Sequence, residues 1–156
     1  MERKGYFCTS KYYFRMEKLL IITPVKDSIQ TTLDTIHAIM ESGISVPYTY
    51  TIYNDNSTPE NTAILEKEAE KYGFRLVNIS DLTDHPSPNY LLVLQMAQEE
   101  ALAQNAGLCI VESDVTVKPD TLQRLFDGAE ARKDCGIAAA VTVDESGTIN
   151  YPYLYA

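Results

Sequence analysis

The sequence predicts an α/β fold, a three-layer αβα sandwich around a mostly parallel sheet. Apolar strand-like runs alternate with helical patterns along the chain, which favours this class. The run Gly107–Val111 is continuously apolar, as strands buried on both faces of a parallel sheet are. The chain has 156 residues, of which 45% are hydrophobic and 22% charged, so it can bury a core and is not disordered.

The first two helices have the clearest signals. The strand Leu19–Ile22 ends at Thr23–Pro24, and apolar residues then recur at helical spacing to Met40. Asp27 or Ser28 can cap this helix, and Gly43 lies just beyond its end. The second helix is expected from Thr58 as cap and Pro59 at its first position to about residue 72.

The other expected elements complete an alternating order. They are strands over 48–53, 74–79, 107–111 and 136–143, a third helix that opens at Ser87–Pro88 and runs to about 104, and a fourth that opens at Pro119. The acidic turn 144–147 predicts a hairpin that returns through 148–155.

Charge and composition exclude several function classes. Lys and Arg number 13 against 22 Asp and Glu, a net charge of −9, so nucleic acid is not an expected partner. No apolar run approaches the roughly 20 residues that a membrane helix needs. The 3 cysteines have no CxxC spacing and indicate a reducing compartment, so we expect a cytoplasmic protein. The 2 histidines are too far apart for a zinc site.

Residues 1–15 differ in character from the rest. They carry Arg3, Lys4, Lys11 and Arg15 but lack the apolar stretch and cleavage site of a secretory signal. We interpret them as an upstream leader whose status the sequence leaves open, and residues 16–156 as one domain.

Polar loops follow three of the predicted strands, and parallel strands bring such loops to one edge of the sheet. The first, Thr23 to Asp27, contains no glycine, so the dinucleotide fingerprint and the phosphate loop are absent. In the second, Thr58 already serves as cap, which leaves Asp55 free. A carboxylate there can accept a hydrogen bond from the imide of uracil or thymine, or from guanine. The alternative is an Asx-turn.

The third loop contains Glu112 and Asp114, one residue apart after the most buried strand. Such carboxylates can bind Mg²⁺ or Mn²⁺, which keep several waters and bridge substrate phosphates. The alternative is a backbone turn at Asp114 with Glu112 in solvent.

Taken in order, these segments resemble family 2 glycosyltransferases, which have the GT-A fold of nucleotide-diphospho-sugar transferases. Residues 19–27 (LLIITPVKD) resemble the opening strand and loop, 52–62 (IYNDNSTPENT) the base-binding segment, and 109–115 (CIVESDV) the strand with the DxD motif. The resemblance covers about Lys18 to Val143. It implies an inverting, metal-assisted transferase that uses a UDP-, GDP- or dTDP-linked sugar and Mn²⁺ or Mg²⁺.

The resemblance also implies residue roles. By this resemblance, the nucleotide pocket would be lined by Thr23, Pro24 and Val25. Asp55 is implied to contact the base, and Asp114 to ligate the metal on the diphosphate.

Two further positions are less regular. Asn89 is implied near the donor ribose or phosphate. Glu112 departs from the first Asp of DxD and is implied near the ribose, the metal or a metal-bound water. Val25 replaces the family's usual aromatic, which leaves base stacking open.

The general base is expected to be absent. In the family it follows the fifth strand, where this chain offers only Asp144 and Glu145, which a hairpin turn explains. The chain is therefore expected to be the donor-binding half of a longer enzyme.

Two other functions stay open. One is a truncated or inert module that binds a nucleotide sugar without transferring it. The other is a receiver-type signalling domain, which needs paired acids after its first strand, where this chain has Thr23–Pro24, and a Lys after its last.

The end of the chain has an alternating aromatic pattern. Tyr151, Tyr153 and Tyr155 would give one aromatic face to a terminal strand. This face would pack on its own sheet, on an absent remainder or on a second copy in a homo-oligomer.

Overall fold

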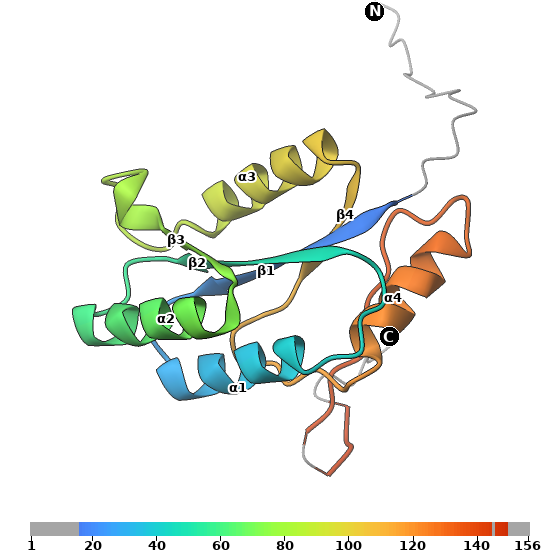
Figure 1. Ribbon diagram of the computed structural model, residues 1–156, viewed down its shortest axis with the longest axis horizontal. Helices are drawn as coiled ribbons and strands as arrows, with labels where there is room; N and C mark the ends of the chain where they lie inside the picture. Colours follow the sequence, from blue (N-terminus) through green and yellow to red (C-terminus); the bar gives the residue numbers. More distant parts are fainter. Residues whose placement is uncertain (1–15, 145, 150–156) are drawn as a thin grey trace, which may run out of the picture.

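A parallel four-stranded sheet organises the fold (Figure 1). The computed structural model describes residues 16–144 and 146–149. The strands are β1 (Lys18–Val25), β2 (Tyr48–Asn54), β3 (Arg75–Asn78) and β4 (Ala106–Ile110), in the order β3-β2-β1-β4. The helices are α1 (Ile29–Met40), α2 (Pro59–Tyr72), α3 (Tyr90–Ala103) and α4 (Thr121–Glu130), with a short 3-10 helix at Ile79–Asp81.

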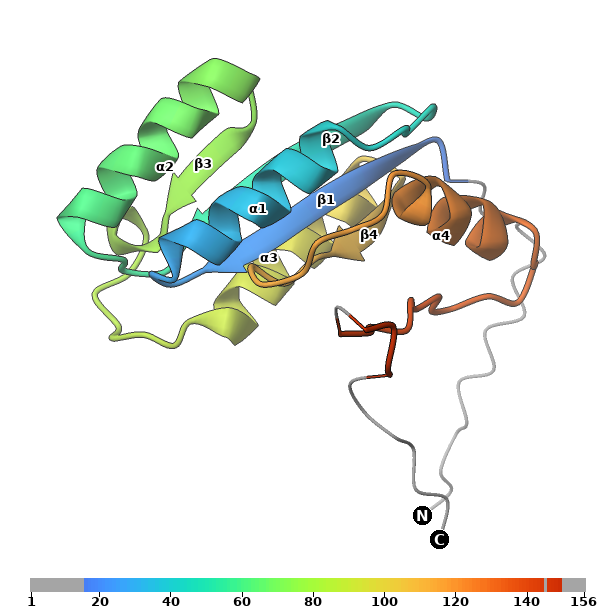
Figure 2. The same cartoon turned by 90° about the horizontal axis from the view of Figure 1, so that it is seen from below.

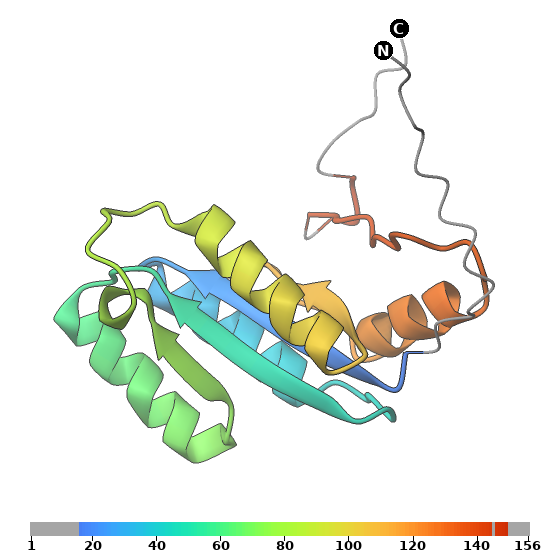
Figure 3. The same cartoon turned by 90° about the horizontal axis from the view of Figure 1, so that it is seen from above.

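The helices form layers on both faces of the sheet. Figure 2 shows α1 and α2 on one face, and Figure 3 shows α3 on the other. The central strand β1 is apolar in nearly every position because it is covered from both sides. Ile21 packs with the α1 and α2 face, whereas Leu20 and Ile22 pack toward α3. The αβα arrangement expected from the sequence is confirmed.

Most predicted boundaries agree with the structure. Helix α2 begins at Pro59, Thr58 Oγ1 accepts a hydrogen bond from the Asn61 N–H at 3.3 Å, and Gly73 ends the helix at φ 76°. Helix α4 begins at Thr121, two residues after the predicted Pro119, and buries Leu122 against the α1 side of the core. Among the described helices, none has both the length and the hydropathy of a membrane span.

The prediction of a fifth strand over 136–143 is wrong. This segment forms no named strand, and Ile137 is 90% exposed. The only pairing in the described part of it is an isolated antiparallel bridge between Val143 and Ile149 around the expected turn. A strand needs a neighbour to satisfy its backbone, and this segment does not pair with the free edge of β4. The leader and the alternating tyrosines lie outside the described residues.

One predicted helix start is wrong, and one predicted cap lacks its capping hydrogen bond. Helix α3 begins at Tyr90 rather than at Ser87–Pro88, since the Ser87 hydroxyl donates to Asp55 instead of capping the helix. Ser28 does occupy the N-cap of α1, but its side chain makes no capping hydrogen bond. The carboxylate of Asp27 lies against α2, not α1.

Candidate functional site

The loops predicted to carry the chemistry do meet at the carboxyl ends of the strands. Val25 at the end of β1 pairs with Asn54 at the end of β2. The Asp55 N–H donates to the Val25 carbonyl at 2.7 Å, and on the other side of β1 the Val111 N–H donates to the Ile22 carbonyl at 2.9 Å. The segments after β1, β2 and β4 therefore leave one edge of the sheet together.

Asp55 is the centre of this edge. It is 8% exposed, and its Oδ2 accepts hydrogen bonds from the Ser87 hydroxyl and the Asn89 N–H, both at 2.7 Å. Its Oδ1 accepts from the Asn89 side-chain amide at 2.8 Å. Burial acts to raise the pKa of Asp55, but the hydrogen bonds from Asn89 and Ser87 outweigh it, and the pKa lies below its usual value. Asp55 is therefore an ionised carboxylate held in place by its neighbours.

Asn89 is bound to the same centre. Its side-chain amide donates to Asp55 and also to the His85 carbonyl at 3.1 Å. Both amide hydrogens are thus used within the protein, and a ligand would find only the side-chain oxygen as a further acceptor. The observed effect of Asn89 is to attach the start of α3 to the end of β2.

Asn54, the residue before Asp55, fixes the turn that carries Asp55. It is 3% exposed, and its amide donates to Thr62 Oγ1 at 3.0 Å and to Asn78 Oδ1 at 2.9 Å. Its Oδ1 accepts from the Ser57 N–H at 3.2 Å. These bonds close the turn after β2, so Asn54 rather than Asp55 makes the Asx-type contact that the sequence left open.

The residues expected to line a nucleotide pocket after β1 are mostly covered. Thr23 is completely buried and its Oγ1 accepts from the Tyr50 hydroxyl at 3.0 Å, while Val25 is 2% exposed in the core. Pro24 is half-buried. In this structure, a ligand at the edge would meet Pro24 and the backbone of this loop rather than the Thr23 and Val25 side chains.

The two acids after β4 are accessible and differ in their contacts. Glu112 Oε1 accepts a hydrogen bond from the Tyr90 hydroxyl at 2.8 Å, which joins this loop to the first turn of α3. Burial, together with the hydrogen bond to Glu112 and its charge, raises the pKa of Tyr90 to about 12. Asp114 is exposed and forms no hydrogen bond or ion pair with any described residue. Its oxygens are free for an external cation.

The donor set fits a metal that is shared with a substrate. Within the described residues, no group of three His, Cys, Asp or Glu side chains is placed to hold a metal on its own. Mg²⁺ and Mn²⁺ commonly bind through one or two carboxylates plus waters and phosphate oxygens. Asp114 with Glu112 supplies that number of carboxylates, so the residues present are compatible with such a metal.

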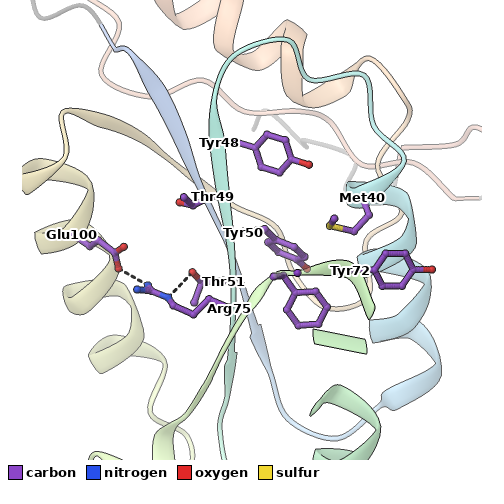
Figure 4. A pocket seen from close by; sticks show the side chains of 10 residues that line it. Met40, Tyr48, Thr49, Tyr50, Thr51, Tyr72, Arg75 and Glu100 are labelled. Atoms are coloured by element: carbon purple, nitrogen blue, oxygen red, sulfur yellow. Dashed lines mark hydrogen bonds and ion pairs between the residues drawn. The ribbon is translucent and has the colours of Figure 1, made fainter. Parts of the chain in front are cut away.

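A cavity of about 370 Å³ lies away from this edge, at the amino ends of β2 and β3. Figure 4 shows its lining side chains on both sides of β2, with Arg75 bonded to Thr51 and Glu100. It exists because β3 begins only at Arg75, opposite Thr51, so residues 48–50 of β2 extend past it. Nothing in the sequence pattern predicted this cavity.

The contacts that sequence reasoning missed are all between distant segments. Ser87, Tyr90, Asn54 and Asp27 each form a hydrogen bond with a residue that is at least 22 positions away in the chain. Their polar character was visible in the sequence, but their partners were not.

A sequence model described as glycosyl transferase family 2 matches residues 20–155. The chain belongs to this family. The match includes all three loops at the edge and most of the described structure. The search of curated proteins found no match.

Solved structures with a similar fold include glycosyltransferases from S. aureus and Pyrobaculum calidifontis. S. aureus TarS 1-349 in complex with UDP-GlcNAc has a TM-score of 0.50 and 20% identity, over 72% of this family 2 chain and 32% of TarS 1-349. A mannosyltransferase from Pyrobaculum calidifontis, in complex with GDP-Man and Mn²⁺, has a TM-score of 0.51 and 15% identity. That match covers 67% of this chain and 30% of the mannosyltransferase chain. These likenesses support the GT-A fold, and the match spans about a third of the length of either solved chain.

Proposed function

We propose that this chain binds a nucleotide-diphosphate sugar at the carboxyl edge of its sheet, as the donor-binding part of a glycosyltransferase. The observation that carries the proposal is the arrangement around Asp55. Its three hydrogen bonds from Ser87 and Asn89 bring the loop after β2 and the start of α3 together in a chain of family 2. This edge is where open α/β sheets bind their ligands.

The base would be recognised by Asp55. Both lone-pair positions of Oδ2 are occupied by protein donors, whereas Oδ1 has one good donor, Asn89, and a distant second, the Asn56 amide at 3.4 Å. Oδ1 can therefore accept one more hydrogen bond. An imide or amide N–H of uracil, thymine or guanine fits that acceptor, and a base bound to Oδ1 would displace the Asn56 amide. Pro24 would border the base, with Asn89 nearer the ribose.

The diphosphate would lie toward the loop after β4. Two acids there would repel it, so we propose that Asp114, assisted by Glu112, would hold Mn²⁺ or Mg²⁺ beside the diphosphate; Glu112 would otherwise face the ribose. Bound there, the cation would neutralise the charge that develops on the departing diphosphate. Tyr90 keeps Glu112 oriented and remains protonated at neutral pH.

Sugar transfer would break the bond from the anomeric carbon to the diphosphate oxygen and form one to an acceptor hydroxyl oxygen. The acceptor's proton would pass to a general base, and attack from the opposite face would invert the anomeric configuration. In this reaction, the residues of this chain would bind the donor. They would orient its nucleotide and hold the diphosphate leaving group.

Thermal unfolding with added nucleotides tests the proposal. We expect UDP, GDP or dTDP, with Mn²⁺, to raise the melting temperature, because a ligand at about 100 times its Kd stabilises by about 2.7 kcal/mol. Asp55→Ala and Asp114→Ala should respond less than the parent. Asp34→Ala is the matched control, since Asp34 is an exposed acid on α1 away from the edge. No shift with any nucleotide would contradict donor binding. Measured turnover of nucleotide sugars then separates a transferase from a module that only binds.

A further inference from the structure

The loop after β1 turns in an unusual way at Asp27. Asp27 has φ 54° and Ser28 has φ 46°, so two successive residues other than glycine adopt the left-handed region. Asp tolerates this region better than most side chains, although it still costs free energy. The turn gives the Asp27 side chain partners at the start of α2 rather than on its own helix α1.

Three hydrogen bonds join this loop to the loop after β2 and to the first turn of α2. Asp27 Oδ1 accepts from the Thr58 N–H at 2.8 Å and from the Asn61 side-chain amide at 3.0 Å. The Asp27 N–H donates to the Ser57 hydroxyl at 2.8 Å. Hydrogen bonds from Thr58 and Asn61 hold the pKa of Asp27 below its usual value, so the carboxylate is charged at neutral pH.

The partners of Asp27 show that this is more than an ordinary cap. In a capping box, the residue at the third position of a helix reaches back to the backbone N–H of its own cap. Asn61 holds that position in α2, yet its amide donates to Asp27, and Asp27 accepts the Thr58 N–H in its place. A residue of the first loop thus completes the cap of the second loop's helix.

We propose that Asp27 is a positioning residue of the nucleotide site, which fixes the loop after β1 against the segment that carries Asp55. This inference rests on the proposed function and goes beyond it, because Asp27 itself need not touch the ligand. Strand pairing sets the spacing of the two loops only as far as Val25 and Asn54. Beyond the sheet, the contacts of Asp27 take over that task. Without them, the loop bordering the base would lose its position relative to Asp55.

The variants can separate positioning from helix capping. Asp27→Gly removes the carboxylate without penalising the positive φ. Asp27→Asn keeps an oxygen that can accept both hydrogen bonds and also tolerates this backbone region. Thr58→Ala is the matched control: it removes the Thr58 Oγ1 cap of α2 but keeps the Thr58 N–H that Asp27 binds.

The experiment is calorimetric titration of each variant with UDP and, separately, with GDP, both with Mn²⁺, after circular dichroism has verified folding. We expect Asp27→Gly to weaken binding about tenfold, which is about 1.4 kcal/mol, and Asp27→Asn to restore binding to within about threefold of the parent. Thr58→Ala should lower the melting temperature yet bind like the parent.

The outcomes distinguish this inference from the proposed function. Parent-like binding by Asp27→Gly would overturn the positioning role and leave the nucleotide site intact. An equal loss of affinity in Thr58→Ala would also overturn it, because helix stability alone would then explain the effect. If the parent binds neither nucleotide, the proposed function fails first and the role of Asp27 fails with it.

Discussion

Asp55 and Asn89 are joined by two hydrogen bonds, from the Asn89 N–H to Oδ2 at 2.7 Å and from the Asn89 amide to Oδ1 at 2.8 Å. The two residues are 34 positions apart in the chain, and both are buried. The pair attaches the first turn of α3 to the end of β2. It combines fold stability and the orientation of the proposed base-binding carboxylate in one contact.

A double-mutant cycle measures this pair. We expect Asp55→Ala to lower the free energy of unfolding by about 3 kcal/mol, because it leaves several donors unsatisfied, and Asn89→Ala by about 2 kcal/mol. The double variant should cost clearly less than the sum, by about 1 kcal/mol or more. Urea denaturation of the four proteins gives the values. Additive losses would show that the two residues stabilise the fold independently.

Acid should weaken the fold partly through Asp55. Its pKa is below the 3.8 of an unperturbed Asp, so the unfolded chain takes up its proton first as the pH falls. The stabilisation is complete above about pH 4 and is lost as the pH falls through the lower folded pKa. The urea midpoint should therefore decrease less between neutral pH and about pH 3 for Asp55→Asn than for the parent. An equal fall would exclude Asp55 as a contributor.

Tyr90→Phe removes the hydrogen bond to Glu112 and little else. Because Tyr90 and Glu112 are both exposed, we expect the free energy of unfolding to change by less than about 1 kcal/mol. Nucleotide affinity in the presence of Mn²⁺ should fall a few-fold, since Glu112 would no longer be oriented. Titration without the metal provides the comparison. Equal affinity of variant and parent with Mn²⁺ would remove Tyr90 from the proposed site.

Replacing each of two glycines by alanine should change the stability of the fold in opposite directions. Gly73 ends α2 at φ 76°, so Gly73→Ala should destabilise by about 1 kcal/mol. Gly128 lies inside α4, and a Cβ there would meet no atom within 4 Å, so Gly128→Ala should stabilise by up to about 1 kcal/mol. Thermal unfolding of both variants checks the helix ends. Changes of the same sign would contradict the boundaries of one of these helices.

Sequence reasoning succeeded where the signals are local. The apolar run of β1 and the Thr58–Pro59 start of α2 predicted those elements to within a few residues, because periodicity and capping act over one or two turns. The strand ends also predicted which loops meet at one edge. Because the strand ends were predicted, Asp55 and Asp114 could be assigned to the loops that follow those strands.

Prediction from the sequence failed where a polar side chain has a partner far away in the chain. Ser87 and Asp27 have the sequence context of caps for α3 and α1, but Ser87 donates to Asp55 and Asp27 accepts from Thr58. Local patterns contain no information about such contacts over 30 residues or more. The expected strand at 136–143 failed for a related reason, since an apolar run becomes a strand only when a neighbour pairs with it.

Direct titration with nucleotide and metal is the closest test of a nucleotide-sugar site at this edge. Calorimetry of the parent with UDP, GDP and dTDP, each with and without Mn²⁺, should show binding of at least one nucleotide that strengthens about tenfold or more with the metal. Asp114→Asn should lose that dependence on Mn²⁺, Asp55→Ala should lose binding in both conditions, and Asp34→Ala should match the parent. Absence of binding in every condition, or parent-like binding by Asp55→Ala, would contradict a nucleotide-sugar site at this edge.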